Sequence, residues 1–164
     1  MERIWAPWRM EYILADKPEG CILCVASYPS GDRDRLILHR TASSFVMLNR
    51  YPYSNGHLMV SPFRHVASLE ALTDEELLDL MKCVRLCCRI LSDAAATQGF
   101  HIGINVGKAA GAGVDDHLHV HVVPRWAGDT NFMTVIGDVR VMPENLLASY
   151  DLLLSAFALQ KGSS

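Results

Sequence analysis

Three histidines that alternate with apolar residues constrain the local structure of this chain more than any other feature. His117, His119 and His121 stand at every second position of the stretch His-Leu-His-Val-His-Val-Val. Residues i, i+2 and i+4 of a β-strand point to one face. The alternation therefore predicts a strand over His117 to Val123, ended by Pro124, with its histidines on one face. One histidine in a strand is usually structural, but three on one face are hard to explain by packing and favour a chemical role.

The spacing of the three histidines limits what they can do together. A strand rises about 3.3 Å per residue, so His117 and His121 lie roughly 13 Å apart at the backbone. One metal ion cannot easily collect all three, and the sequence predicts that they divide the work. Neutral imidazole is a good nucleophile near neutral pH and forms labile covalent intermediates, including those with phosphorus.

A glycine-rich loop, Gly107 to Gly113, leads directly into this predicted strand. Glycines allow backbone amides to turn inward and form an anion-binding concavity. The loop lacks the Gly-Lys-Ser/Thr of a P-loop and the spacing of a dinucleotide-binding fold. Taken alone it fits a bare surface loop equally well, but its position before the histidines favours a phosphate cradle.

The remaining pattern predicts an α+β fold with a mainly antiparallel sheet, because strands, a helix, strands and a second helix follow one another. The clearest helix is predicted over Thr73 to Gln98, with a capping box of Thr73 and Glu76 and with Gly99 as its stop. Pro143 is predicted to open the final helix. Short strands are predicted over 36–38, 44–49, 57–61 and 100–106. The apolar stripe of the long helix is predicted to comprise Leu77, Leu80, Met81, Val84, Cys87, Cys88, Leu91 and Ala95.

Length and charge exclude several classes of protein. A chain of 164 residues, half of them hydrophobic, suggests one domain with a sizeable core. A net charge of −3 argues against nucleic-acid or membrane-surface binding through a basic field. No apolar stretch is long enough for a transmembrane helix, and the N-terminus lacks a signal-peptide core. We therefore expect a cytoplasmic protein with reduced cysteines, in which Cys21-x-x-Cys24 is a metal or redox element rather than a disulfide.

At His117, His119 and His121 the sequence resembles the histidine triad (HIT) family, whose signature is three histidines alternating with apolar residues. The stretch 49–60, Asn-Arg-Tyr-Pro-Tyr-Ser-Asn-Gly-His-Leu-Met-Val, resembles the nucleotide-binding hairpin of that family. Asn105-Val-Gly107 and Ala110-Gly111 resemble its approach loop. The resemblance covers roughly residues 20 to 126. The continuation 124–132 and the Trp-Ala-Pro-Trp-Arg start resemble a bacterial branch that includes diadenosine tetraphosphate phosphorylases.

The resemblance implies a HIT-like, five-stranded antiparallel sheet in each subunit, with one long helix and a C-terminal helix. It implies a single domain over 1–164, with an N-terminal arm at 1–20, a core at 20–126 and a helical extension at 127–160, while 161–164 are expected to be disordered. Family members form homodimers through the long helix and a sheet edge. If Trp5 and Trp8 cover a further interface, a homotetramer results.

The family also implies the activity and the roles of individual residues. It implies an enzyme, a nucleotidyl transferase or hydrolase that acts on the α-phosphate of dinucleoside polyphosphates and needs no organic cofactor. His119 attacks phosphorus, a carbonyl near His117 orients the ring of His119, His121 contacts the phosphate or the bridging oxygen, and His57 supports the histidines. The residues expected to bind nucleotide or phosphate are Asn49, Asn105, Gly107, Gly111, Gly113 and His121.

The loop before the triad departs from the family pattern and leaves the acceptor open. Many family hydrolases carry a glutamine and a hydroxyl residue here, whereas this chain reads Ala-Gly-Ala-Gly-Val-Asp-Asp over 110–116. Water and phosphate therefore both stay open as acceptors, and a nucleoside phosphoramidate hydrolase is the alternative within the enzyme class. A non-catalytic nucleotide sensor or zinc-stabilised interaction module is disfavoured by the intact triad. Asp115 and Asp116 either oppose an anionic acceptor or form a solvated turn, and the turn is preferred.

Several relatives of the family pair a Cys-x-x-Cys with two histidines around zinc. His65 and His117 match the positions of those two histidines. The resemblance thus implies a structural zinc site of Cys21, Cys24, His65 and His117. The alternative is two buried thiols beside an exposed His65. The remaining cysteines, Cys83, Cys87 and Cys88, are expected in the core, and His39 and His101 are expected to be structural.

Overall fold

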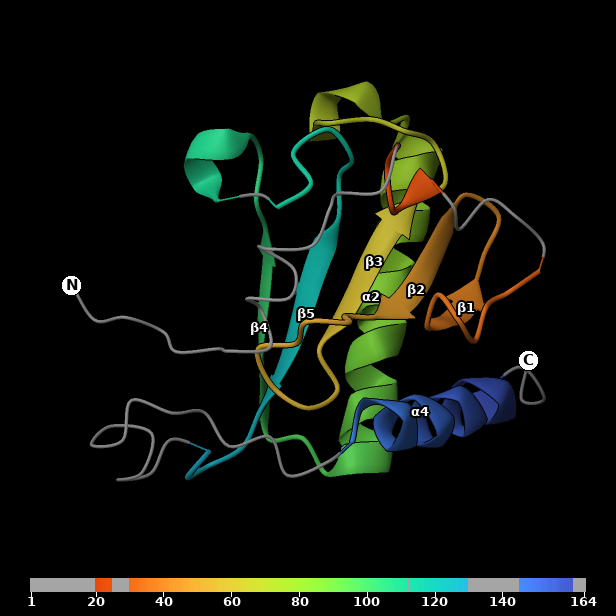
Figure 1. Ribbon diagram of the computed structural model, residues 1–164, viewed down its shortest axis with the longest axis vertical. Helices are drawn as coiled ribbons and strands as arrows, with labels where there is room; N and C mark the ends of the chain where they lie inside the picture. The colour runs from red at the N-terminus through yellow and green to blue at the C-terminus, as the bar shows by residue number, and fades with distance from the viewer. Residues whose placement is uncertain (1–19, 25–29, 112, 130–144, 161–164) are drawn as a thin grey trace.

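The computed structural model describes residues 20–24, 30–111, 113–129 and 145–160. Its five strands form one antiparallel sheet in the order β1-β2-β3-β5-β4, which confirms the expected fold class (Figure 1). The strands and long helices, in chain order, are β1 (Ile37–Arg40), β2 (Ser44–Leu48), β3 (Leu58–Pro62), α2 (Asp74–Ala95), β4 (Gly99–Ile104), β5 (Val120–Arg125) and α4 (Leu146–Gln160).

The two helices lie on the same side of the sheet and build the main core with it. Helix α2 packs on β2, β3 and β5, and α4 packs on α2 and β1 (Figure 1). Alternate strand residues such as Val46, Val60 and Val122 point into this core, as period-2 alternation requires. The buried hydroxyl of Tyr150 in α4 donates to the Ile37 carbonyl at 2.9 Å and fixes α4 against β1.

A second, smaller apolar cluster covers the opposite face of the sheet. It consists of Leu23, Ile37, Phe45 and Met59, with Val114 among the residues packed on it. Met59 pairs with His121 in the β3–β5 register, so the histidines lie on this face of the sheet, away from α2. Among the described residues, the face that carries the histidines is therefore lined by apolar side chains rather than covered by a helix.

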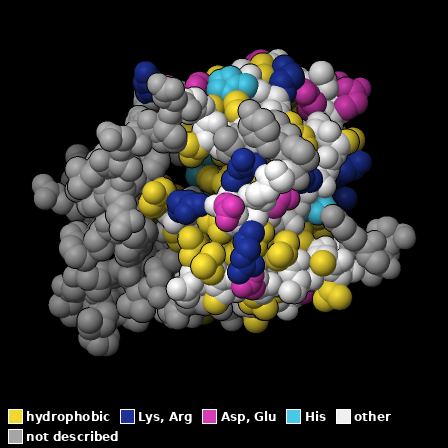
Figure 2. All heavy atoms as spheres, turned by 45° about the vertical axis from the view of Figure 1, so that its right-hand side comes forward, with side chains coloured by type: hydrophobic (Ala, Val, Ile, Leu, Met, Phe, Trp, Pro, Cys, Tyr) yellow, Lys and Arg dark blue, Asp and Glu magenta, His cyan; other side chains and the backbone are white. Residues whose placement is uncertain are grey.

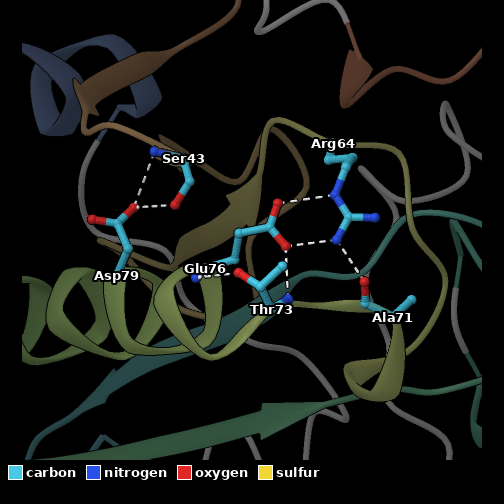
Figure 3. Close-up of polar contacts among 6 residues, drawn as sticks. All are labelled: Ser43, Arg64, Ala71, Thr73, Glu76 and Asp79. Atoms are coloured by element: carbon cyan, nitrogen blue, oxygen red, sulfur yellow. Dashed lines mark hydrogen bonds and ion pairs between the residues drawn. The ribbon is translucent and has the colours of Figure 1, made fainter.

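The start of α2 agrees with the prediction, but its end does not. Thr73 and Glu76 form the expected capping box, shown in Figure 3. The helix ends at Ala95 because Ala96 takes the left-handed conformation, with φ 47°. The predicted end at Gln98 and the predicted stop at Gly99 were wrong, since Gly99 instead opens β4.

The histidine strand begins three residues later than predicted. Leu118 N donates to the Val66 carbonyl at 2.6 Å, and the Leu118 carbonyl accepts from the Ser61 hydroxyl, so the regular ladder starts only at Val120. The strand also continues through Pro124 to Arg125. Pairing with β3 reaches only to Val122, and a proline is tolerated where a strand has no partner on one side.

The surface of the helical side is mixed in character. Leu77 and Met81, which were predicted in the buried stripe of α2, are exposed, and Ile90 is buried in their place. Figure 2 shows cationic, anionic and hydrophobic side chains interspersed among the coloured residues of the face that it draws. None of the helices in the described residues is long and apolar enough to cross a membrane. The predictions for Trp5, Trp8, Pro143 and the C-terminal tail lie outside the described residues.

Candidate active site and metal site

Side chains from Leu118 to Val122 lie on alternating faces of the sheet, as predicted. Leu118, Val120 and Val122 lie in the main core, whereas His119 and His121 lie on the other face. His117 and His119 are nearly inaccessible, at 1% and 5% exposure, and His121 is half-buried. Buried imidazoles need hydrogen-bond partners, and the partners of each ring define its function.

The ring of His119 is oriented by a backbone carbonyl. Its Nδ1 lies 2.9 Å from the carbonyl oxygen of His117, an oxygen that can only accept. Neutral His119 therefore carries its proton on Nδ1 and a lone pair on Nε2. This arrangement prepares Nε2 as a nucleophile or base.

Hydrogen bonds through His57 give His121 the opposite tautomer to that of His119. The backbone N–H of Tyr53 donates to Nδ1 of His57 at 3.1 Å, so Nδ1 of His57 is an acceptor. His57 Nε2–H then donates to Nδ1 of His121 at 3.0 Å. In the neutral state this leaves the proton of His121 on Nε2. His57 is fully buried, and its ring stacks on Tyr53 with centroids 5.1 Å apart.

His119 and His121 both line an open cleft on this face of the sheet. Their rings meet edge to face at 4.8 Å between centroids. Of the residues predicted to bind nucleotide or phosphate, the cleft brings together Asn49, Asn105, Gly111, Gly113 and His121.

Two predicted residues lie outside the cleft lining. His57 lies behind His121, within hydrogen-bonding distance of it, and its supporting role stays a prediction. Gly107 turns the chain before the loop with a φ of 78°, and its carbonyl accepts from Ala110 N. Its phosphate-binding role stays a prediction.

Sequence reasoning missed the apolar part of the cleft. The walls include Ile22, Leu23, Tyr51, Tyr53, Met59 and Val114. Met59 was foreseeable, because it lies two residues after His57 and faces the same way along β3. The placement of Ile22 and Leu23 depends on how a distant segment packs, and no local pattern in the sequence indicates it.

Asn49 is oriented by the hairpin that carries it. Its Oδ1 accepts from Tyr51 N at 2.9 Å, and its Nδ2 lies 3.3 Å from Nδ1 of His57. These two contacts fix which way the amide faces, so Asn49 presents a defined edge to the cleft.

The four predicted metal ligands meet at one point. Nitrogen and sulfur atoms of Cys21, Cys24, His65 and His117 all lie within 4.8 Å of one another. The Sγ of Cys24 lies 3.1 Å from His65 Nδ1 and 3.6 Å from His117 Nδ1, and the Sγ of Cys21 lies 3.4 Å from His117 Nδ1. Tetrahedral zinc with these ligands would separate them by roughly 3.3–3.8 Å. The donor set fits a metal ion.

Both histidines of this cluster turn Nδ1 inward and place Nε2 on an oxygen. His117 Nε2 lies 2.9 Å from the Pro62 carbonyl, and His65 Nε2 lies 3.5 Å from Asp116 Oδ2. Metal-bound histidines are typically oriented in this way by a carbonyl or carboxylate. Asp116 therefore faces His65, and Asp115 faces Lys108 at 3.7 Å. Neither aspartate is among the described residues that line the cleft.

Burial affects the protonation of the cluster in two ways. It lowers the pKa of His117, against the opposing effect of the Pro62 carbonyl, and so favours the neutral imidazole that a metal needs. It raises the pKa of the Cys24 thiol, and the neighbouring Cys21 adds to this rise. A cation reverses the second effect, so metal binding here releases protons.

The remaining cysteines lie in or against the main core, as expected, and His39 and His101 have contacts away from the cleft. Cys83 and Cys87 are buried in the main core, and Cys88 packs against it. His39 stacks on Phe157, and His101 Nδ1 lies 3.3 Å from an Arg125 nitrogen.

Comparison with known proteins gives a consistent set of relatives. A sequence model described as the HIT domain matches residues 31–128. AP-4-A phosphorylase of Mycobacterium tuberculosis is 39% identical over 98% of this chain and 86% of its own length. The asymmetrical bis(5'-nucleosyl)-tetraphosphatase of Schizosaccharomyces pombe is 35% identical over 65% of this chain and 57% of its own. A crystal structure of a Zn-bound histidine triad family protein from Mycobacterium smegmatis matches with a TM-score of 0.69 at 26% identity, over 88% of this chain and 98% of the other.

Proposed function

Because this chain belongs to the HIT domain family, we propose that it is an enzyme that cleaves dinucleoside polyphosphates of the diadenosine tetraphosphate type at an α-phosphate. The observation that carries this proposal is the orientation of His119. Its Nδ1 is committed to the His117 carbonyl, which leaves Nε2 as the nucleophilic atom in an open cleft.

The two cleft histidines have complementary parts in the reaction. His119 Nε2 attacks the α-phosphorus, forming an N–P bond as the bond from phosphorus to the bridging oxygen breaks. The polyphosphate departs with the electron pair of that bond, and His121 Nε2–H donates to the departing oxygen. Water or phosphate then attacks the phosphorus of the nucleotidyl-histidine. The N–P bond breaks, and neutral His119 is restored. His57 acts through His121 as a positioning residue.

Different parts of the cleft suit the base, the ribose and the phosphates of a nucleotide. The apolar and aromatic wall offers contact area to a base, and Asn49 beside it is our candidate for the ribose hydroxyls. Asn105, Gly111 and Gly113 lie where they can donate to phosphate oxygens. Glycine at 111 has a φ of 81°, a conformation that other residues rarely adopt, so the loop geometry depends on it.

Whether water or phosphate accepts the nucleotide from His119 is tested by following diadenosine tetraphosphate turnover with and without inorganic phosphate. We expect phosphate to accelerate turnover and to yield ADP, because the relative that aligns with nearly the whole chain is a phosphorylase. AMP formed at the same rate in both conditions would make the enzyme a hydrolase. A preference for an adenosine phosphoramidate over the tetraphosphate would select the phosphoramidate alternative. Tight AMP binding without turnover of any of these substrates would favour the sensor.

We also propose that the Cys21, Cys24, His65 and His117 cluster binds structural zinc. Protein expressed in zinc-replete medium is expected to contain about one zinc per chain by elemental analysis. Cys24→Ser should lose the metal, whereas Cys88→Ser, which changes a cysteine outside the cluster, should keep it. A wild-type content below about 0.2 zinc per chain would contradict the site.

A homodimer is our proposal for the assembled state. Strand β4 is at an edge of the sheet and carries Ile102, which is 50% exposed. An exposed apolar edge strand invites pairing with a second copy. The single-domain boundaries, the tetramer and the cytoplasmic location stay predictions from the sequence.

A further inference from the structure

The metal cluster and the nucleotide cleft are built from overlapping segments. Residues 20–24 supply two thiols to the cluster and the side chains of Ile22 and Leu23 to the cleft. The segment that carries His117 also supplies Gly113 and Val114 to the cleft. A change in how the cysteine turn is held therefore reaches the cleft through Ile22 and Leu23.

The fold fixes the His65 side of the cluster without a metal. Arg64, the residue before His65, binds both oxygens of Glu76 at 2.9 and 2.6 Å and the Ala71 carbonyl at 2.5 Å (Figure 3). Glu76 also accepts from Thr73 N at the start of α2. This network ties the loop after β3 to the helix N-terminus.

The fold fixes His117 as well. Its ring is almost fully buried and bonds to the Pro62 carbonyl, while the next residue, Leu118, is bonded through its N–H to Val66. Two of the four ligands are thus placed by contacts that do not involve the ion.

The cysteine turn lacks comparable anchors. Within the described part of the chain, the hydrogen bonds that join residues 20–24 to other segments are the thiol contacts with His65 and His117. The remaining backbone bond, Cys24 N to the Cys21 carbonyl, is internal to the turn. Leu23 adds apolar packing against the cluster of Ile37, Phe45 and Met59. If a metal bound here, both cysteines would lose their protons and bond to the ion as thiolates, and the ion would link the turn to the two fixed imidazoles.

We propose that the metal sets the affinity of the cleft for nucleotide by pinning the cysteine turn, so that Ile22 and Leu23 form part of the cleft wall. This inference rests on the proposed function of the cleft. Loss of the ion releases the turn and removes that wall, while His119 and His121 keep their partners. The effect falls on nucleotide binding more than on the chemical step.

The test measures AMP binding by titration calorimetry in zinc-loaded and chelator-stripped protein. We expect binding to weaken by about tenfold or more on stripping, the scale of losing the contact of one or two aliphatic side chains, and to recover when Zn²⁺ is restored. His65→Ala should reproduce the stripped state, because this half-exposed side chain leaves no cavity when it is truncated. Cys88→Ser is the matched control and should bind AMP like the wild type.

Ile22→Ala sharpens the test through coupling between the turn and the ion. In the loaded protein it should weaken AMP binding, but in the His65→Ala background it should have no further effect, since the wall is already lost. Additive effects of the two substitutions would overturn the inference. So would equal AMP affinity with and without metal in protein whose circular dichroism shows a retained fold. Failure of the loaded wild type to bind AMP would instead refute the proposed function.

Discussion

His119→Ala is expected to lower kcat/KM for diadenosine tetraphosphate by on the order of 10⁴-fold or more, the scale found when a covalent nucleophile is removed. The reason is geometric, because His119 is the cleft histidine whose Nδ1 bonds to a carbonyl and whose Nε2 is thereby an acceptor. No other histidine that lines the described cleft has its Nδ1 bonded to a carbonyl oxygen. AMP binding should change far less, since alanine removes the attacking atom and leaves the walls in place.

The matched control is His101→Ala, which removes an exposed histidine of β4 that contacts Arg125 rather than the cleft. This variant should keep wild-type turnover. The intermediate offers a second readout: wild-type protein quenched in acid-free denaturant during turnover should carry a phosphorus-labelled adduct that the His119→Ala protein lacks. Retained turnover in a folded His119→Ala protein would remove this residue from the mechanism.

The second large effect is expected at His121, whose Nε2–H we assign as donor to the departing oxygen. His121→Ala should slow cleavage of diadenosine tetraphosphate by roughly 10²- to 10⁴-fold, the usual contribution of a positioned proton donor. A dinitrophenyl ester of AMP should be affected much less, because its phenolate leaves without needing a proton. Equal losses on the two substrates would show that His121 holds the substrate and does not assist the leaving group.

Much of this site follows from sequence periodicity, and the errors have local causes. Alternation placed His119 and His121 on the face opposite Leu118 and Val120, which the core confirms. The strand boundary was wrong because Leu118 bonds to Val66, a partner 52 positions away along the chain, rather than to a neighbouring strand. The helix end was wrong because Ala96, a residue without special propensity for it, adopts the left-handed conformation that glycine usually supplies.

Features that depend on contacts between distant segments were out of reach of sequence patterns. Leu23 is buried against β-strand residues and lines the cleft, yet nothing within its own stretch marks it as a wall. Asp116 shows the same limit. Its position beside the triad suggested either a solvated turn or a pocket residue. Its side chain is 64% exposed, in line with the preferred turn, but no local pattern indicates that its carboxylate also faces His65 of the metal cluster.

The orientation of the two cleft histidines has a consequence for how this site tolerates change. One ring is set by the peptide carbonyl of His117 and the other, through His57, by the peptide N–H of Tyr53. Both are main-chain groups that every residue except proline provides in full. The backbone therefore determines that His119 presents a lone pair and His121 presents an N–H to the reacting phosphate. Substitution of the Tyr53 side chain can change the shape of the cleft and its substrate preference, while His119 remains the nucleophile and His121 the proton donor.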